Sequence, residues 1–147
     1  MRFRLLAAGV TVSVLAACGG ESTGPNSTAN IGGTWQLVAS ISNAGLQLSC
    51  TASGVVSVSE SGQNFTGQVS GSSETCTGPG GSISDTIDGP LTGGQISGSS
   101  VSYSDGECTY TGSMTGDPVN LIKGPVSCTI PIQGQNYQFT GTWQISR

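Results

Sequence analysis

The side chains that could perform acid–base or nucleophilic chemistry are few in this chain of 147 residues. It has no histidine, so the commonest general base and metal ligand is missing. Serines are abundant, but none lies in a Gly-x-Ser-x-Gly elbow, and nothing in the sequence places one beside Lys123, the only lysine. We therefore predict no catalytic residue, no cofactor and no metal site, and we expect the protein not to be an enzyme.

Paired carboxylates could hydrolyse a glycosidic bond, but the acids of this chain are poorly placed for that reaction. Asp85 and Asp88 have opposite parity along a strand, and Asp105 and Glu107 flank a turn glycine, where solvated acids are common. Asp85 shares the parity of the two flanking isoleucines, which predicts an inward carboxylate with a partner or a raised pKa. The favoured interpretation of this stretch is nevertheless a loop between Gly81 and Gly89.

The N-terminus combines a basic start at residues 1–4 with a short apolar run, which is typical of an export signal. The apolar run is too short for a membrane span of about 20 residues. Leu15-Ala16-Ala17-Cys18 resembles the lipobox of bacterial lipoproteins. That resemblance implies a signal peptide over residues 1–17 and a lipidated Cys18, attached to the membrane by more than one acyl chain. An aspartate directly after the lipidated cysteine resembles an inner-membrane retention signal. Gly19 occupies that position here, and the absence of the aspartate favours the outer membrane. The alternative is ordinary cleavage near Ala17, which leaves a free thiol.

The five cysteines agree with one lipid anchor and two disulfides. Assigning Cys18 to lipid leaves four, and four cysteines in an oxidising compartment suggest two bridges. Three connectivities are possible. We favour Cys50–Cys76 and Cys108–Cys128, because each pair lies within one local stretch of strands, and free buried thiols are the alternative.

Charge excludes two classes of partner. From residue 18 onward the chain carries two basic and eight acidic side chains, a net charge of −6. Nucleic-acid binding needs clustered lysine and arginine, so we exclude it. Attachment to anionic lipid headgroups is excluded on the same ground, which leaves acyl chains as the membrane contact.

Residues 18–30 are rich in Gly, Ser, Thr and Asn and predict a flexible tether after the lipidated cysteine. Residues 31–147 change to an alternation of period two, which predicts an all-β domain. Trp35, Leu37, Ala39 and Ile41 share one strand face. The inward series at the C-terminus consists of Tyr137, Phe139, Gly141, Trp143 and Ile145. Turn signals between many short strands indicate a barrel or, alternatively, a β-sandwich.

A weak internal repeat of aromatic, Thr, Gly, any residue and a large apolar residue begins at Phe65, Tyr110 and Phe139. On a strand the aromatic, the glycine and the last residue point the same way. Glycine between two large inward side chains relieves crowding and permits the bends that barrel closure needs. We interpret the repeat as structural.

Gly33-Thr34-Trp35 resembles the Gly-x-Trp opening of lipocalins. The resemblance implies a single antiparallel up-and-down β-barrel in which Trp35 plugs one end. It also implies that a basic side chain near the C-terminus packs on that tryptophan, a role that Arg147 could fill. The helix that follows the lipocalin barrel has no counterpart here.

A lipocalin-like barrel could hold one small apolar ligand in its mouth. The candidate ligand contacts are Trp35, Tyr103, Tyr110 and Asp85. The leading hypothesis is therefore a membrane-anchored, non-catalytic lipoprotein of the cell envelope that binds such a ligand. The alternative is a structural or interaction module whose barrel is filled by its own side chains.

Overall fold

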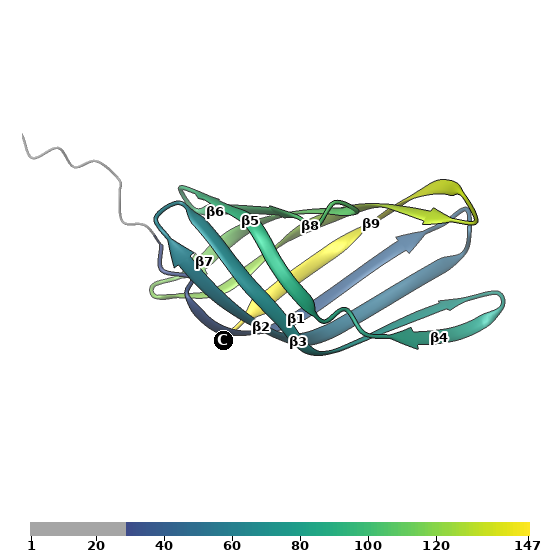
Figure 1. Cartoon of the computed structure of the whole chain (residues 1–147), viewed down its shortest axis with the longest axis horizontal. Helices are drawn as coiled ribbons and strands as arrows, with labels where there is room; N and C mark the ends of the chain where they lie inside the picture. Colours follow the sequence, from purple (N-terminus) through teal and green to yellow (C-terminus); the bar gives the residue numbers. More distant parts are fainter. Residues whose placement is uncertain (1–28) are drawn as a thin grey trace, which may run out of the picture.

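The computed structural model describes residues 29–147, which form strands joined by short turns (Figure 1). The predicted signal peptide, Cys18 and most of the tether lie outside the described residues. The strands are β1 (Gly33–Asn43), β2 (Leu48–Ser61), β3 (Asn64–Gly78), β4 (Gly81–Asp85), β5 (Gly89–Ser97), β6 (Ser100–Ser104), β7 (Cys108–Gly116), β8 (Val119–Ile132) and β9 (Gln135–Ser146). In the part of the chain from 29 to 147, no helix is long and apolar enough to cross a membrane.

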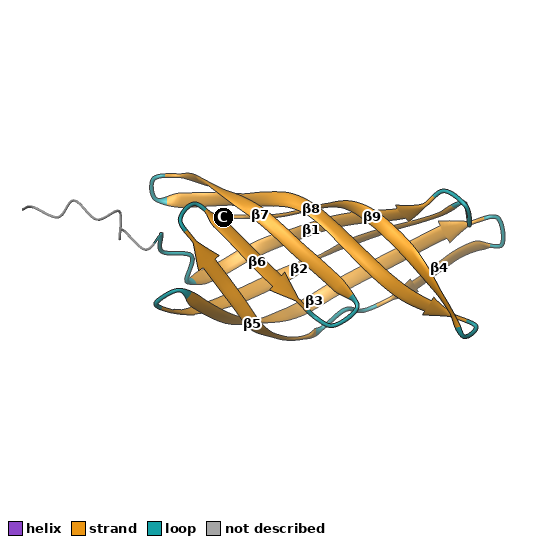
Figure 2. Cartoon of the chain, turned by 90° about the horizontal axis from the view of Figure 1, so that it is seen from above, coloured by secondary structure: helices purple, strands orange, loops and turns teal. Residues whose placement is uncertain are grey.

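All strand pairs are antiparallel, and eight strands form a closed ring. The sheet order is β2-β1-β9-β8-β7-β6-β5-β3, and an additional pairing of β2 with β3 closes it. Figure 2 shows the strands wrapping around one axis. The predicted antiparallel up-and-down barrel is confirmed, and the sandwich alternative is wrong, because one continuous sheet closes on itself instead of two sheets packing face to face.

Strand β4 lies outside the ring, because β3 changes partner along its length. Residues Asn64–Val69 pair with β5, whereas Glu74–Gly78 pair with β4. Gly71 has a φ of 57° between these two stretches. The buried Ser72 beside Gly71 binds the segment that connects β4 to β5. Its backbone N–H donates to the carboxylate of Asp88 at 2.8 Å, and its hydroxyl accepts the N–H of Ile87 at 2.8 Å.

The two predicted inward series are confirmed. On β1 and β9 the inward residues are buried or half-buried, while their neighbours face solvent. Inward residues gather in two apolar clusters. The larger one surrounds Trp35 at the end where the chain enters the barrel and where it finishes, and the smaller one surrounds Phe139 toward the other end.

The glycines of the aromatic-Thr-Gly repeat lie where neighbouring groups come close. A Cβ at Gly112 would lie 2.8 Å from Cζ2 of Trp143, and one at Gly67 would lie 2.6 Å from the carbonyl oxygen of Ser57. At Gly141 the same atom would overlap the backbone of Ser40. The structural interpretation of the repeat is therefore confirmed.

Two disulfides join neighbouring strands and confirm the predicted pairings. Cys50 on β2 lies directly opposite Cys76 on β3, and Cys108 on β7 lies directly opposite Cys128 on β8. Each bridge therefore spans one rung of the sheet. Disulfides of this kind are typical of proteins that fold outside the cytoplasm.

Candidate ligand cavity

One end of the barrel is sealed by Trp35, whose side chain is 0% exposed. Its indole N–H donates to the carbonyl of Ile31 at 2.8 Å. The guanidinium carbon of Arg147 lies 4.2 Å from the centre of the indole ring, which places the cation over the aromatic face. The predicted packing of Arg147 on Trp35 is confirmed. Trp35 was also a candidate ligand contact, but its side chain closes the end of the barrel and does not line the cavity.

Arg147 also connects the two ends of the described chain. Its guanidinium donates to the carbonyl oxygens of Asn30, Gly32 and Val119 at 3.0, 2.8 and 2.9 Å. The backbone N–H of Ile31 donates to the carboxylate of Glu60 at 2.7 Å. The bonds to Asn30, Ile31 and Gly32 satisfy backbone groups that lie before β1, so the entry of the chain is fixed against the closed end.

Beyond this seal the barrel contains a cavity of about 680 Å³. This volume lies in the range of small-molecule sites, about 300–1,000 Å³. The lining is mostly inward aliphatic side chains from the strands, and it includes Leu37, Ile41, Val56, Val69 and Ile122. The barrel interior is thus only partly filled by its own side chains.

Five aromatic side chains line the cavity, and three of them, from β6, β7 and β9, contact one another. The ring centres of Tyr103 and Tyr110 lie 5.6 Å apart, and Tyr110 meets Trp143 edge to face at 5.9 Å. The indole N–H of Trp143 donates to the carbonyl of Thr111 at 2.9 Å, which fixes the orientation of the ring. Tyr103 and Tyr110 therefore lie where the sequence predicted. Trp143 was not among the candidate contacts, although its inward parity on β9 was the available signal.

Acidic side chains lie at the mouth, where the sequence suggested only turn chemistry. Glu74, Asp105 and Glu107 line the cavity together with the aromatic rings. Burial, and then the neighbouring carboxylate of Asp85, raise the pKa of Glu74. The hydroxyl of Tyr110 donates to Asp105 at 3.4 Å, and burial followed by the charge of Asp105 raises the pKa of Tyr110.

Asp85 is exposed, contrary to the prediction of an inward carboxylate with a partner. Its strand parity was correct, since it lies opposite Glu74 in the β3–β4 pair. However, β4 has no second neighbour, so this face meets solvent, and the Asp85 carboxylate accepts only the N–H of Thr86, at 2.8 Å. The loop interpretation is also wrong for residues 81–85, which form β4. The adjacent Ile83 lines the rim of the cavity and is 74% exposed.

Three side chains at the mouth lie close enough to bind a metal ion, but two of them are joined in a disulfide. Ligand atoms of Cys50, Glu74 and Cys76 lie within 4.8 Å of one another. Both sulfurs belong to a disulfide, so they are not available as thiolates. One carboxylate remains, and it packs against the disulfide.

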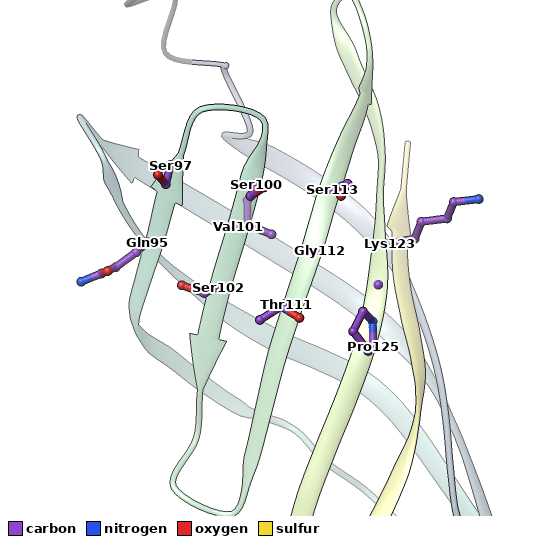
Figure 3. Close-up of a pocket in the computed structure, with 11 residues that line it drawn as sticks. Gln95, Ser97, Ser100, Val101, Ser102, Thr111, Gly112, Ser113, Lys123 and Pro125 are labelled. Atoms are coloured by element: carbon purple, nitrogen blue, oxygen red, sulfur yellow. The ribbon is translucent and has the colours of Figure 1, made fainter.

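A second hollow, of about 450 Å³, lies on the outer face of β5 to β8 (Figure 3). Hydroxyl side chains dominate its lining: Ser97, Ser100, Ser102, Thr111 and Ser113. The side chain of Lys123 lies at its edge and points away from it (Figure 3). The hollow therefore has hydrogen-bonding groups but no pair of groups suited to proton transfer.

No protein-family model matches the chain, and no curated protein matches it in sequence. Among solved structures, the chain is similar to the siderocalin Ex-FABP, described as functioning through dual ligand specificities. The two share 15% sequence identity over 80% of this chain and 69% of the other, with a TM-score of 0.33.

Proposed function

We propose that this protein is a non-catalytic lipoprotein of the cell envelope that binds a small apolar molecule inside its barrel. The observation that carries the proposal is the apolar cavity of about 680 Å³, sealed by Trp35 and accessible at the opposite end. Burial of apolar ligand surface would supply the binding free energy, at about 25 cal/mol per Å².

Anchoring through Cys18 is the second part of the proposal, and it rests on the lipobox resemblance. The described chain begins at residue 29, at the sealed end, while the mouth lies at the other end with β4 (Figure 1). An anchor on Cys18 would then hold the sealed end toward the membrane. The ligand would be taken from the aqueous side of the envelope, and the outer membrane is the proposed location.

The ligand proposal is tested by filling the cavity from one inward position. Ala39 and Ala52 lie opposite each other on β1 and β2, and both line the cavity. Ala39→Phe would place a ring inside, whereas Val38→Phe adds the same ring one residue earlier on the outer face, where Val38 is 51% exposed. The measurement is native mass spectrometry of each exported protein, carrying Cys18→Ser, after incubation with lipid extract.

We expect ligand mass on the parent protein and on Val38→Phe, and none on Ala39→Phe. Both variants should retain an intact mass four hydrogens light, which reports two disulfides. A parent protein that carries no extra mass, or equal ligand loading by all three proteins, would contradict binding in the barrel.

The anchor is tested separately by radioactive palmitate labelling of cells that express the full chain. We expect label on the parent protein and none on Cys18→Ser. Incorporation into the serine variant would exclude Cys18 as the acylation site.

A further inference from the structure

The wall of the barrel is interrupted at the mouth. Strand β4 pairs only with β3, and β7 begins at Cys108 although its partner β8 continues to Ile132. The opening therefore lies between the β3–β4 hairpin on one side and the β6–β7 turn on the other. Figure 2 shows β4 extending past that turn.

Both sides of this opening carry negative charge. Glu74 and Asp85 lie opposite each other on the β3–β4 hairpin, and Asp105 and Glu107 belong to the β6–β7 turn. Glu74 on one side and Asp105 and Glu107 on the other line the same cavity, so acids from both sides face one opening. A cation that enters the opening would be attracted by carboxylates from both sides.

No described basic side chain neutralises these acids. Residues 29–147 contain only two basic side chains. Arg147 lies over Trp35 at the sealed end, and Lys123 points outward from β8 (Figure 3). The described residues form no salt bridge with the mouth carboxylates. Asp105 accepts the backbone N–H groups of Glu107 and Cys108 and the hydroxyl of Tyr110, and these neutral donors leave the negative charge of the mouth uncompensated.

The aromatic rings provide a second attraction for the same kind of ligand. Tyr103, Tyr110 and Trp143 lie together just inside the acids, with centre-to-centre distances of 5.6 and 5.9 Å. The faces of such rings attract cations, most strongly when the cation is partly removed from water. An apolar cavity below, aromatic rings beside it and carboxylates at the entrance match an amphipathic molecule with a cationic head.

We infer that the ligand is an amphipathic organic cation, whose apolar part enters the cavity while an ammonium group lies between Tyr110, Trp143 and the acids at the mouth. This inference rests on the proposed function and specifies its ligand class. It gives the mouth a specificity that an apolar cavity alone lacks, because an anion of the same length would meet only negative charge.

The test compares three probes with the same chain length and compact heads: decylammonium, decanol and decanoate. Binding to the full chain carrying Cys18→Ser is measured by titration calorimetry at neutral pH, with each probe below its micelle concentration. We expect decylammonium to bind at least about tenfold more tightly than decanoate, a difference of about 1.4 kcal/mol. Its affinity should fall as salt is added, because salt screens the exposed carboxylates.

Matched variants locate the charge effect. Glu74→Gln combined with Glu107→Gln removes one acid from each side of the opening, and we expect a loss of about fivefold or more in decylammonium affinity, with decanol unchanged. Asp117→Asn removes an acid between β7 and β8, near the sealed end, and should leave all three affinities unchanged. Tyr110→Leu should weaken decylammonium more than decanol.

The outcomes separate the two proposals. If the three probes bind equally, or if decanoate binds best, the inference of a cationic ligand is wrong while ligand binding in the barrel stands. If none of the three probes binds, both proposals fail for ligands with a ten-carbon chain. If no molecule from the lipid extract binds either, ligand binding in the barrel is itself overturned. An equal loss from Asp117→Asn and from the double variant would also overturn the role of the mouth acids.

Discussion

The two ends of the barrel are stabilised in different ways. At the sealed end Trp35 is completely buried, aliphatic side chains surround it, and Arg147 covers its ring. At the mouth the ring of strands is interrupted, Ile83 and Ile87 are exposed, and carboxylates gather. At the sealed end every strand has two neighbours, and the hydrogen bonds of Arg147 add to the apolar packing. Where neighbours are missing, other interactions have to hold the strands.

The disulfides lie beside these missing neighbours. Cys76 belongs to the part of β3 that pairs with the edge strand β4, and Cys108 is the first residue of β7. Both bridges connect strands within the wall and do not cross the barrel, so they reinforce the edges without obstructing the cavity. The open end therefore combines two covalent bonds with the smaller apolar cluster, whereas the sealed end has the larger apolar cluster and the contacts of Arg147.

The largest expected effect comes from breaking the sealed end. Trp35→Ala should lower the free energy of unfolding by about 3–5 kcal/mol, since it removes a fully buried aromatic side chain and leaves a void. Urea unfolding measures the loss. Trp143→Ala is the matched change in the middle of the barrel, where Trp143 packs against both apolar clusters, and it should cost less because Trp143 is only half-buried. A larger loss at Trp143 would contradict the assignment of the main core to the sealed end.

A somewhat smaller effect is expected from breaking the mouth. Replacing both cysteines of either bridge with alanine should lower the free energy of unfolding by about 2–4 kcal/mol. Amide hydrogen exchange should quicken in the β3–β4 hairpin after loss of Cys50–Cys76, while β1 around Trp35 stays protected. Uniform loss of protection over the whole barrel would show that the two ends are not stabilised separately.

The smallest effect concerns the acids of the mouth and depends on pH. The pKa of Glu74 is raised in the fold by burial and by Asp85, so the folded protein holds this proton more tightly than the unfolded chain does. The stability that Glu74 contributes is therefore present below its unfolded pKa and is lost as the pH rises through its raised folded pKa. Glu74→Gln should be more stable than the parent at neutral pH by under about 1 kcal/mol. The advantage should disappear when the pH falls below about 4, where the unfolded carboxyl also binds its proton.

Asp88 provides a control of opposite sign. Hydrogen bonds from the Ser72 hydroxyl and backbone lower its pKa, so it stabilises the fold above its unfolded pKa, and this contribution is lost as the pH falls through the lower folded value. Asp88→Asn should therefore be less stable than the parent at neutral pH and approach it in acid. Urea unfolding at several pH values compares the two variants, and the same sign for both would contradict the assigned environments.

Sequence patterns predicted the parts of this molecule that depend on local rules. The alternation on β1 and β9, the glycines beside large inward residues and the two disulfides follow from strand parity and from proximity along the chain. The change of partner at Gly71 could not be predicted, because it depends on which distant strand occupies each side of β3. The exposure of Asp85 follows from this change of partner, because β4 then pairs with β3 alone and has no second neighbour.

The cavity was only partly predictable for the same reason. Tyr103 and Tyr110 were expected to face inward, and they do. Glu74 and the β6–β7 turn line the same cavity although they are far apart in the sequence, because their placement depends on how the ring is closed and interrupted. Parity assigns a side chain to a face of the sheet, but only the assembled barrel determines whether that face is sealed, open or at an edge.

The contacts of Arg147 have a mechanical consequence. Its guanidinium donates hydrogen bonds to the carbonyls of Asn30 and Gly32, so Arg147 holds the segment that precedes β1. A pull on the N-terminal segment would be shared between β1 and β9 from the outset, and these two strands are themselves paired. Such a load would act along the whole ladder of hydrogen bonds between β1 and β9, and it would be applied at the end of the barrel opposite the mouth.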